Sequence, residues 1–442
     1  MVKIVIVAII CVLAMLLTAC NNSGSNDNQQ GENNISNDTY TEITLGGIWV
    51  SHGVRRAVTA FNLENEGFQI EILCYDTMFG WDAAVTRFSL DMIAGQGPDI
   101  IYGFNNEVLE DTEFLADLYS FLDSDPILNR TDFLPNILTA MENRSGKLQF
   151  ISNYFTISPY YAMPETVAEV GLLTYENIIR WLSESDSRSF GDEWMHRYWF
   201  VLESVLSFSD DFIDWENGIA HLDSDTFIYM LNIAQTMPEP EQFGFRNEME
   251  DLLSGNQLLT MEQVANVDDL RGGLRQDALS AAGLGGMIPV GVPSTNFGQH
   301  EFFMGHSLIL GINAASHHQE AAWGFIRSTL VPDGFAAELG LPLRIDVLES
   351  LIAESMTPNV IDGEEMKRPT GSFGDMMYAM TEEEAAELWY VINNTSLRPR
   401  RSEAVREIML EGLQQFFSGS ATAEDAARIM QSRVQIYLWE RN

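Results

Sequence analysis

The sequence has 442 residues, of which 46% are hydrophobic and 20% are charged, so the chain can bury cores of normal size and does not have the composition of a disordered protein. Asp and Glu total 64 against 24 Lys and Arg, a formal net charge of −40 at pH 7. This charge repels the phosphates of nucleic acids and of anionic lipids, which excludes nucleic-acid binding and a polybasic membrane-surface role. The length predicts two or three domains, of which two large lobes are the simplest arrangement.

Residues 1–20 have the pattern of a lipoprotein signal peptide. Lys3 precedes an apolar run from Ile4 to Leu17, which is too short and too early for a membrane-spanning helix. The run ends in Leu17-Thr18-Ala19-Cys20, which resembles the bacterial lipobox, whose cysteine is lipidated and becomes the mature N-terminus. An ordinary secretory signal with a chance cysteine is the alternative.

Residues 21–40 consist mainly of Asn, Ser, Gly, Asp and Gln, with almost no apolar side chains. Such a segment cannot bury a core and is predicted to be a flexible tether. A tether behind a lipid anchor, such as palmitate on Cys20, would hold a folded domain at the extracellular face of the bacterial cell membrane.

The first folded segment alternates between strand and helix patterns. We expect strands at 43–50, 68–74 and 99–102, and helices at 55–64 and 82–94. Gly95 and Gly97 can end the second helix, and Pro98 prevents it from resuming before the strand that starts at Asp99. Alternation of this kind implies a mainly parallel sheet with right-handed crossovers.

The rest of the chain is mainly helical in pattern. We expect helices at 114–122, 132–141, 174–182, 193–206, 223–234, 320–330, 382–392, 403–417 and 423–439. Short strands are expected at 147–151, 258–261, 287–290 and 307–312. Asn217-Gly218 predicts a hairpin within 212–222. After Arg344 we expect only helices.

Four stretches, in this order and spacing, carry a resemblance to a known family. They are Ala94–Ile100, Ser307–Ser316 with its following helix, Gly340–Asp346 and Phe417–Ala427. Behind a lipobox, this set resembles the extracellular solute-binding proteins of ABC importers, in particular the carbohydrate-type, maltose-binding-protein-like group (family 1).

The resemblance implies an α/β fold of the type II periplasmic-binding-protein kind, in which two lobes are joined by a hinge and close on a ligand in the interlobe cleft. It implies an N-lobe of residues 41–155 plus 300–345 and a C-lobe of residues 156–299 plus 346–442. Tyr160–Pro164 and Thr174–Asn177 depart from the family's usual Tyr-Tyr-Asn-Lys and Thr-Trp-Asp-Glu, which indicates a divergent subgroup.

Aromatic and planar polar residues in stretches that match the family's binding segments are the candidate ligand contacts, because sugars are bound by aromatic faces and by polar groups that hold their hydroxyls. They are Trp49, Ser51, Phe104, Asn105, Asn153, Tyr154, Glu262, Gln263, His306 and Arg400. Core packing is the competing interpretation for Trp49 and Phe104, and a structural role is the competing interpretation for His306.

Motifs for catalysis, metals and cofactors are not recognisable. His300–Met304 begins like a zinc helix but lacks the second histidine, and no Gly-x-Ser-x-Gly elbow occurs. Gly95-Gln96-Gly97 lacks the third glycine of a dinucleotide fingerprint. We therefore expect no enzyme activity, no metal and no cofactor.

The sequence thus predicts a lipid-anchored, monomeric solute-binding protein that captures a small ligand, a sugar or oligosaccharide, and delivers it to the permease subunits of an ABC importer. The alternatives are a surface lipoprotein enzyme, such as a glycoside hydrolase, and a ligand sensor or adhesin on the same fold. The acidic composition is interpreted as a solvation device, with attraction of cationic ligands as the alternative.

Overall fold

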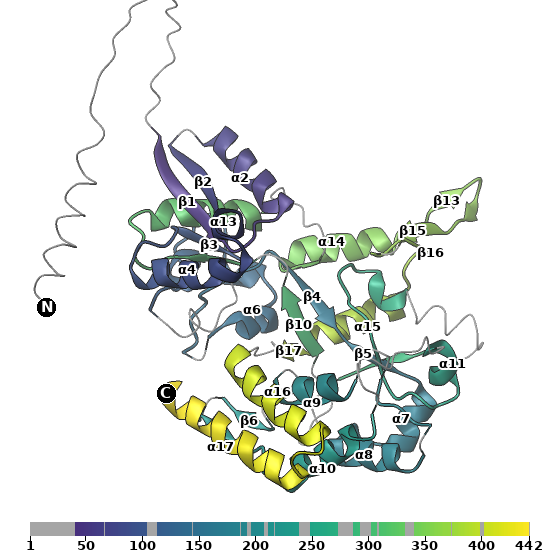
Figure 1. Ribbon diagram of the computed structural model, residues 1–442. Coiled ribbons are helices and arrows are strands. Elements are labelled where there is room, and N and C mark those ends of the chain that lie inside the picture. Colours follow the sequence, from purple (N-terminus) through teal and green to yellow (C-terminus); the bar gives the residue numbers. More distant parts are fainter. Residues whose placement is uncertain are drawn as a thin grey trace, which may run out of the picture. The chain divides into compact units, whose positions relative to one another are not determined.

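The computed structural model describes residues 40–441, except 66, 104–112, 144, 186, 192–195, 207–210, 216, 238–247, 273–285, 292–301, 307–308, 332–339, 373 and 398–401. Figure 1 shows the helices and strands of this part of the chain. Everything below concerns these residues.

Helices and strands are interspersed along the described chain, and they alternate most regularly at its start (Figure 1). The strands are β1 (Thr41–Gly47), β2 (Phe68–Cys74), β3 (Ile100–Tyr102), β4 (Tyr154–Ser158), β5 (Tyr160–Ala162), β6 (Ile213–Asp214), β7 (Ile219–Ala220), β8 (Thr260–Met261), β9 (Ile288–Val290), β10 (Phe302–His306), β11 (Leu310–Ile312), β12 (Leu341–Pro342), β13 (Val360–Ile361), β14 (Glu364–Glu365), β15 (Arg368–Thr370), β16 (Asp375–Met377) and β17 (Thr395–Leu397). The α-helices are α2 (His52–Glu64), α3 (Tyr75–Phe79), α4 (Trp81–Ile93), α5 (Tyr119–Leu122), α6 (Pro135–Met141), α7 (Pro164–Val170), α8 (Tyr175–Ser183), α9 (Arg197–Leu206), α10 (Asp225–Ala234), α11 (Glu248–Leu253), α13 (Gln319–Leu330), α14 (Ile345–Ser355), α15 (Glu382–Asn393), α16 (Glu403–Phe417) and α17 (Ala423–Arg441). Two short 3-10 helices are η1 (Arg130–Asp132) and η2 (Asp269–Arg271).

The first sheet has the strand order β11–β3–β1–β2. β1 runs parallel to both β2 and β3, whereas β11 is antiparallel to β3. The expected β-α-β-α-β segment is confirmed, because α2 connects β1 to β2, and α3 and α4 connect β2 to β3. The parallel strands have their carboxyl ends at one edge of the sheet, which is the usual place for ligands in open α/β sheets.

The turn between α4 and β3 is shaped by two glycines. Gly95 has a φ of 67°, in the left-handed region that ends helices. A Cβ on Gly97 would lie 2.3 Å from the Sδ atom of Met92, so the chain returns tightly under its own helix. The side-chain amide of Asn313 donates hydrogen bonds to the carbonyl oxygens of Gly97 (3.2 Å) and Pro98 (3.0 Å). The turn is therefore fixed from both sides.

A second sheet, with the order β12–β4–β10–β17, and a three-stranded sheet, β8–β5–β9, follow in the chain. β4 is antiparallel to both β12 and β10, and β5 is antiparallel to both β8 and β9. β4 and β5 are separated by Pro159 alone. The two sheets thus follow each other with the shortest possible connection.

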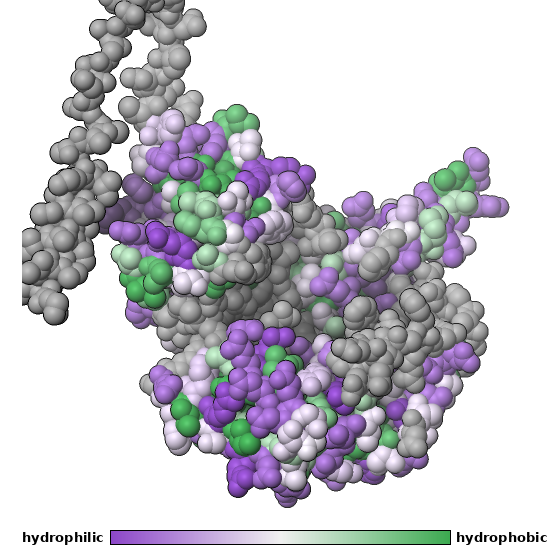
Figure 2. Space-filling view, in the orientation of Figure 1, coloured by the Kyte–Doolittle hydropathy of each residue, from purple (hydrophilic) through white to green (hydrophobic). Residues whose placement is uncertain are grey.

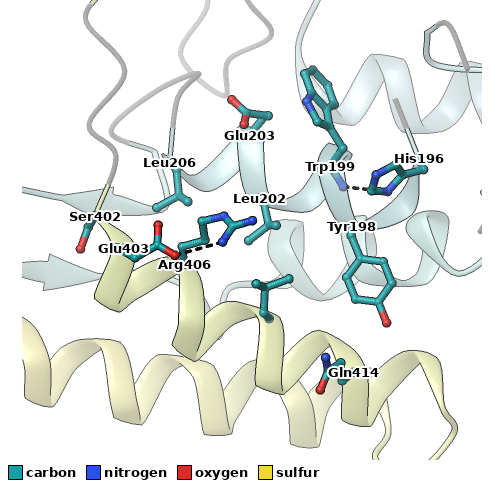
Figure 3. Close-up of a pocket in the computed structure, with 11 residues that line it drawn as sticks. His196, Tyr198, Trp199, Leu202, Glu203, Leu206, Ser402, Glu403, Arg406 and Gln414 are labelled. Atoms are coloured by element: carbon teal, nitrogen blue, oxygen red, sulfur yellow. Dashed lines mark hydrogen bonds and ion pairs between the residues drawn. The ribbon is translucent and has the colours of Figure 1, made fainter. Parts of the chain in front are cut away.

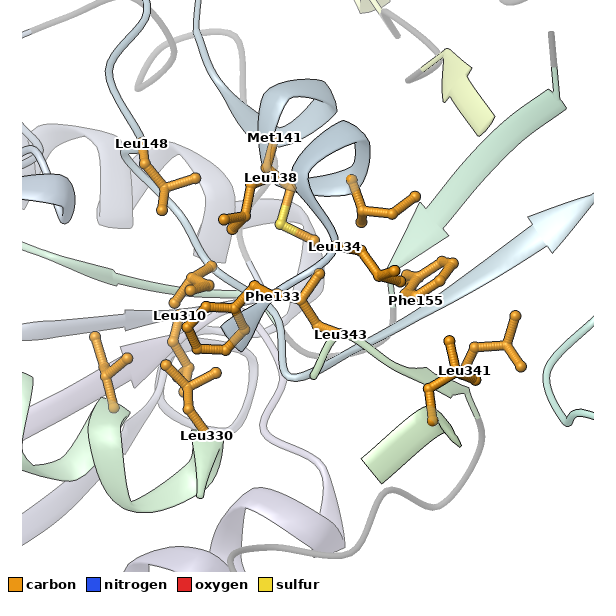
Figure 4. Close-up of a cluster of buried hydrophobic side chains, with 14 of the residues drawn as sticks. Phe133, Leu134, Leu138, Met141, Leu148, Phe155, Leu310, Leu330, Leu341 and Leu343 are labelled. Atoms are coloured by element: carbon orange, nitrogen blue, oxygen red, sulfur yellow. The ribbon is translucent and has the colours of Figure 1, made fainter. Parts of the chain in front are cut away.

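Two separate clusters of buried hydrophobic side chains form the main cores. The first extends in sequence from Ile43 to Ile392, and Figure 4 shows part of it, where β4, β11, β12, α6 and α13 meet. The second extends from Tyr160 to Leu438 and contains α8, α9, α10, α16 and α17. The two cores agree with a two-lobe chain, although the lobe boundaries stay a prediction.

β5 contributes to both cores. Tyr160 and Ala162 belong to the second cluster, and Tyr161 and Met163 belong to the first. This follows from the strand geometry, in which successive side chains point to opposite faces. All four residues are buried, so the departure from the family's Tyr-Tyr-Asn-Lys pattern at this place is a substitution of core residues.

Several expected elements differ in the structure. Residues 147–151 form no strand, and only Ile151 makes an isolated bridge, to Leu310. The helix expected at 114–122 is reduced to α5, because Leu115 instead pairs with Asn313 beside β11.

The expectation of helices alone after Arg344 is wrong, because the hairpins β13–β14 and β15–β16 lie between α14 and α15. Asp362 and Gly363 both have positive φ, as the tight turn of the β13–β14 hairpin requires.

The surface over α16 and α17 is largely hydrophilic in Figure 2, with scattered hydrophobic residues. No described helix combines the length and the hydrophobicity needed to cross a membrane.

Candidate ligand-binding site

Four of the predicted functional residues lie outside the described part of the chain: Cys20, Phe104, Asn105 and Arg400. For His306, the structure gives the backbone pairing alone, opposite Phe155. The other predicted ligand contacts form two groups, one at each of the four-stranded sheets.

The first group lies at the carboxyl end of β1. Trp49 is 56% exposed, and Ser51 is 8% exposed. The Ser51 hydroxyl accepts a hydrogen bond from the backbone N–H of Val54 (3.2 Å), which caps the N-terminus of α2. Gly46 is paired with Ile101 in parallel strands, so Trp49 and Gly103 follow their strands at the same edge of the sheet.

The second group lies around β4. The Asn153 side chain is buried, and its Nδ2 donates to the carbonyl oxygen of Thr329 at 3.1 Å. Gln263 Nε2 lies 3.5 Å from Thr156 Oγ1, which brings the segment after β8 next to this strand. Tyr154 and Glu262 are both half-buried. The structure therefore brings Asn153, Tyr154, Glu262, Gln263 and the backbone of His306 to one strand.

A pocket of about 590 Å³ lies between α9 and α16, beside the second core, and is shown in Figure 3. Its volume is in the range of ~300–1,000 Å³ that is typical of small-molecule sites. The lining residues are His196, Tyr198, Trp199, Leu202, Glu203, Leu206, Ser402, Glu403, Arg406, Leu410 and Gln414.

The α9 side of the pocket carries its aromatic residues. The Tyr198 ring packs edge-on against Phe417, with ring centroids 4.8 Å apart. Trp199 is half-buried, and Glu203 lies one helical turn further along the same face. Helical spacing thus places an aromatic ring and a carboxylate side by side.

His196 immediately precedes α9 and fixes its start. Its Nδ1 accepts a hydrogen bond from the backbone N–H of Trp199 (3.3 Å), in the manner of a helix N-cap. Burial and the nearby charge of Arg197 hold the pKa of His196 below its usual value. The imidazole is therefore neutral near pH 7, as its role as an acceptor requires.

The α16 side of the pocket carries its charges. Ser402 caps the helix by accepting a hydrogen bond from the Val405 N–H at 3.3 Å. Arg406 Nη1 donates to Glu403 Oε1 at 3.1 Å, and both side chains are exposed to solvent. The pair can therefore exchange its partners with a ligand at small cost, since exposed ion pairs are weak.

The pocket combines aromatic surface with carboxylate, guanidinium and amide groups. Aromatic faces pack on the C–H surfaces of sugars, and the planar polar groups can hold their hydroxyls. Within the described ranges, no group of three or more His, Cys, Asp and Glu residues could hold a metal ion. The chemistry of the pocket suits the binding of a polar ring-shaped molecule.

None of the residues that line this pocket is among the ligand contacts expected from the sequence, although two expected features lie close to it. Residues 193–206 were expected as a helix and Arg400 as a contact two residues before Ser402. The spacing of Trp199 and Glu203 gives the signal that could have identified α9, since residues four apart lie on one helix face and here bring an aromatic and an acidic side chain together.

No family model and no curated protein matches the sequence. The chain is similar in structure to the sugar-binding protein MalE from the phytopathogen Xanthomonas citri, with a TM-score of 0.56 and 16% identity, covering 91% of this chain and 98% of that one. A periplasmic oligogalacturonide-binding protein from Yersinia enterocolitica gives a TM-score of 0.55 and 15% identity, covering 90% and 99%. A de novo designed cysteine esterase, ECH19, gives 0.56 and 16%, covering 91% and 99%. The expected type II periplasmic-binding-protein fold is confirmed.

Proposed function

We propose that the protein captures a sugar or oligosaccharide and delivers it to an ABC importer. The observation that carries this proposal is the pocket between α9 and α16, where Tyr198 and Trp199 accompany the carboxylates and the guanidinium that can hold hydroxyls. The fold supports it, because the structural neighbours include a sugar-binding and an oligogalacturonide-binding protein.

The proposed ligand contacts come from both cores. The pocket lies beside the second core, whereas Trp49 follows β1 at the carboxyl edge of the first sheet. A ligand held by both would favour a closed arrangement of two lobes, which a permease could recognise, since binding energy shifts the equilibrium between such states.

The anchoring at the membrane is proposed from the sequence alone. Cys20 in its lipobox would carry the lipid, and residues 21–40 would connect it to the folded part, which begins with β1. The protein would then act as a monomer at the extracellular face of the cell membrane.

A glycoside hydrolase is the second candidate, because Glu203 and Glu403 line one pocket and such enzymes use two carboxyl groups. The designed esterase with the same fold shows that the fold itself does not decide between binding and catalysis.

Calorimetric titration of the full chain with saccharides, followed by chromatography of the recovered ligand, tests both candidates. We expect binding with the ligand unchanged, and Trp199→Ala should weaken it at least tenfold because a stacking face is lost. Trp439→Ala is the matched control, because Trp439 is 69% exposed on α17 outside the pocket. Cleaved ligand would replace the binding proposal with the hydrolase.

A further inference from the structure

The charges that line the pocket do not balance. The ionisable side chains of the described lining are Glu203, Glu403, Arg406 and His196. Arg406 is paired with Glu403 at 3.1 Å. Burial lowers the pKa of His196, so the imidazole adds no charge near pH 7. Glu203 forms no ion pair with any described residue, so among the described lining its carboxylate is the one charge without an opposite charge beside it.

Glu203 has an aromatic neighbour on its own helix. Trp199 precedes it by one turn, and both side chains are half-buried and line the pocket. Figure 3 shows Glu203 extending from α9, apart from the Glu403–Arg406 pair on α16. Among the described residues no cation pairs with this carboxylate, so a cationic group of a bound molecule can take that place.

A protonated amine can interact with Glu203 and with Trp199 at the same time. Its N–H groups can donate charge-assisted hydrogen bonds to the Glu203 carboxylate, and its positive charge is attracted to the face of an indole ring. A hydroxyl at the same place can also donate to the carboxylate, but it gains neither the attraction between opposite charges nor the attraction of a cation to the ring. The net charge of −40 also raises the concentration of cations around the protein.

We propose that the pocket selects a saccharide that carries a protonated primary amine, and that Glu203 determines this selectivity together with the face of Trp199. The inference rests on the proposed function, and it names the class of saccharide that the site would take.

The test compares disaccharides that differ in one group. The glucosamine disaccharide with free amines, its N-acetylated counterpart, maltose and spermidine are titrated calorimetrically into the full chain at about pH 6.5. We expect the free-amine disaccharide to bind about tenfold more tightly than the N-acetylated one, and this ratio should fall as the salt concentration rises.

Two variants with the same change in net charge distinguish a local effect of Glu203 in the pocket from the attraction of cations by the protein's overall negative charge. Glu203→Gln should reduce the amine preference, measured as the ratio of the dissociation constants of the two disaccharides, to less than about twofold. Glu407→Gln should keep the preference, because Glu407 is an exposed residue of α16 that does not line the pocket.

Each remaining outcome counts against the inference. Equal binding of the free-amine and N-acetylated disaccharides, a preference that survives Glu203→Gln, or one lost equally in Glu407→Gln overturns it and leaves the proposed function intact. The inference is also overturned if the unsubstituted protein prefers the free-amine disaccharide by a ratio that does not change with salt concentration. Binding of spermidine alone, or of no saccharide, overturns the proposed function as well.

Discussion

The Asp99 carboxylate holds Thr44 by both its backbone and its side chain. Asp99 Oδ2 accepts hydrogen bonds from the Thr44 N–H at 2.8 Å and from its hydroxyl at 2.9 Å, and the Asp99 N–H donates to Thr44 Oγ1 at 3.0 Å. Asp99 Oδ1 accepts from the Ser316 hydroxyl at 2.6 Å. One side chain at the start of β3 thus connects β1 to the segment after β11.

Asp99→Ala should lower the free energy of unfolding by about 2 kcal/mol, because it leaves the donors of Thr44 without their charged acceptor. Ser316→Ala removes one bond of the same carboxylate and should cost about 1 kcal/mol. Urea unfolding followed by tryptophan fluorescence measures both. An equal or larger loss for Ser316→Ala would contradict the central role of Asp99.

Gly46→Ala should destabilise the first sheet by about 1–3 kcal/mol. The added Cβ would lie 2.4 Å from Cγ and 2.9 Å from Cβ of Pro98, whose ring cannot rotate away. Gly324→Ala is the matched control, since no heavy atom lies within 4 Å of its added Cβ and alanine favours the interior of α13. Thermal unfolding should show a lower Tm for Gly46→Ala and a higher Tm for Gly324→Ala. Equal shifts of Tm in the two variants would refute the steric explanation.

Ser51→Ala should lower the free energy of unfolding by about 1 kcal/mol, because the N-terminus of α2 loses its cap. Asparagine is also a good N-cap, so Ser51→Asn should recover most of the stability. Thermal unfolding checks the pair, and titration with a saccharide shows whether Ser51 is also a ligand contact. A loss of stability that Ser51→Asn does not recover would argue against the capping role.

His196 should make the protein less stable in mild acid. Its pKa in the folded state is lowered, mainly by burial, below the ~6.5 of an exposed histidine. The unfolded chain therefore takes up the proton first, so the contribution of His196 is present above about pH 6.5 and is lost as the pH falls.

His196→Asn keeps an acceptor for the Trp199 N–H but cannot titrate. Urea unfolding at pH 7.5 and 5.0 should show that the difference in stability between the two proteins shifts in favour of the variant at the lower pH. A constant difference, or a shift in the other direction, would contradict the lowered pKa.

The alternation of strands and helices up to Tyr102 could be predicted because the spacing of hydrophobic residues and the turn-forming residues indicate the same boundaries there. Gly95, Gly97 and Pro98 restrict the backbone locally, and the structure shows the turn that they predict. Residues 114–118 carry a helical pattern but form no helix, because Leu115 pairs with Asn313 and the Ala116 N–H donates to the carbonyl of Ile312. A contact so distant in sequence leaves no local signal.

The candidate site shows the same limit. Trp49 and Ser51 could be placed at a sheet edge because they follow a recognisable strand. The pocket between α9 and α16 could not, because it joins residues on either side of position 300, and the sequence does not show which helix faces pack together. The Asp362-Gly363 pair that forms the turn of the β13–β14 hairpin is a turn signal in the sequence, but it lies between segments of helical pattern.

The two-sided strand β5 has a consequence for synthesis. A chain made from its N-terminus presents Tyr160 and Tyr161 early, yet their cores are completed only by residues as late as Leu438 and Ile392. Neither core can therefore be complete when half of the chain has been translated. Hydrophobic side chains of the second core stay exposed until the last helices leave the ribosome. The nascent protein should depend on chaperones until translation is almost finished.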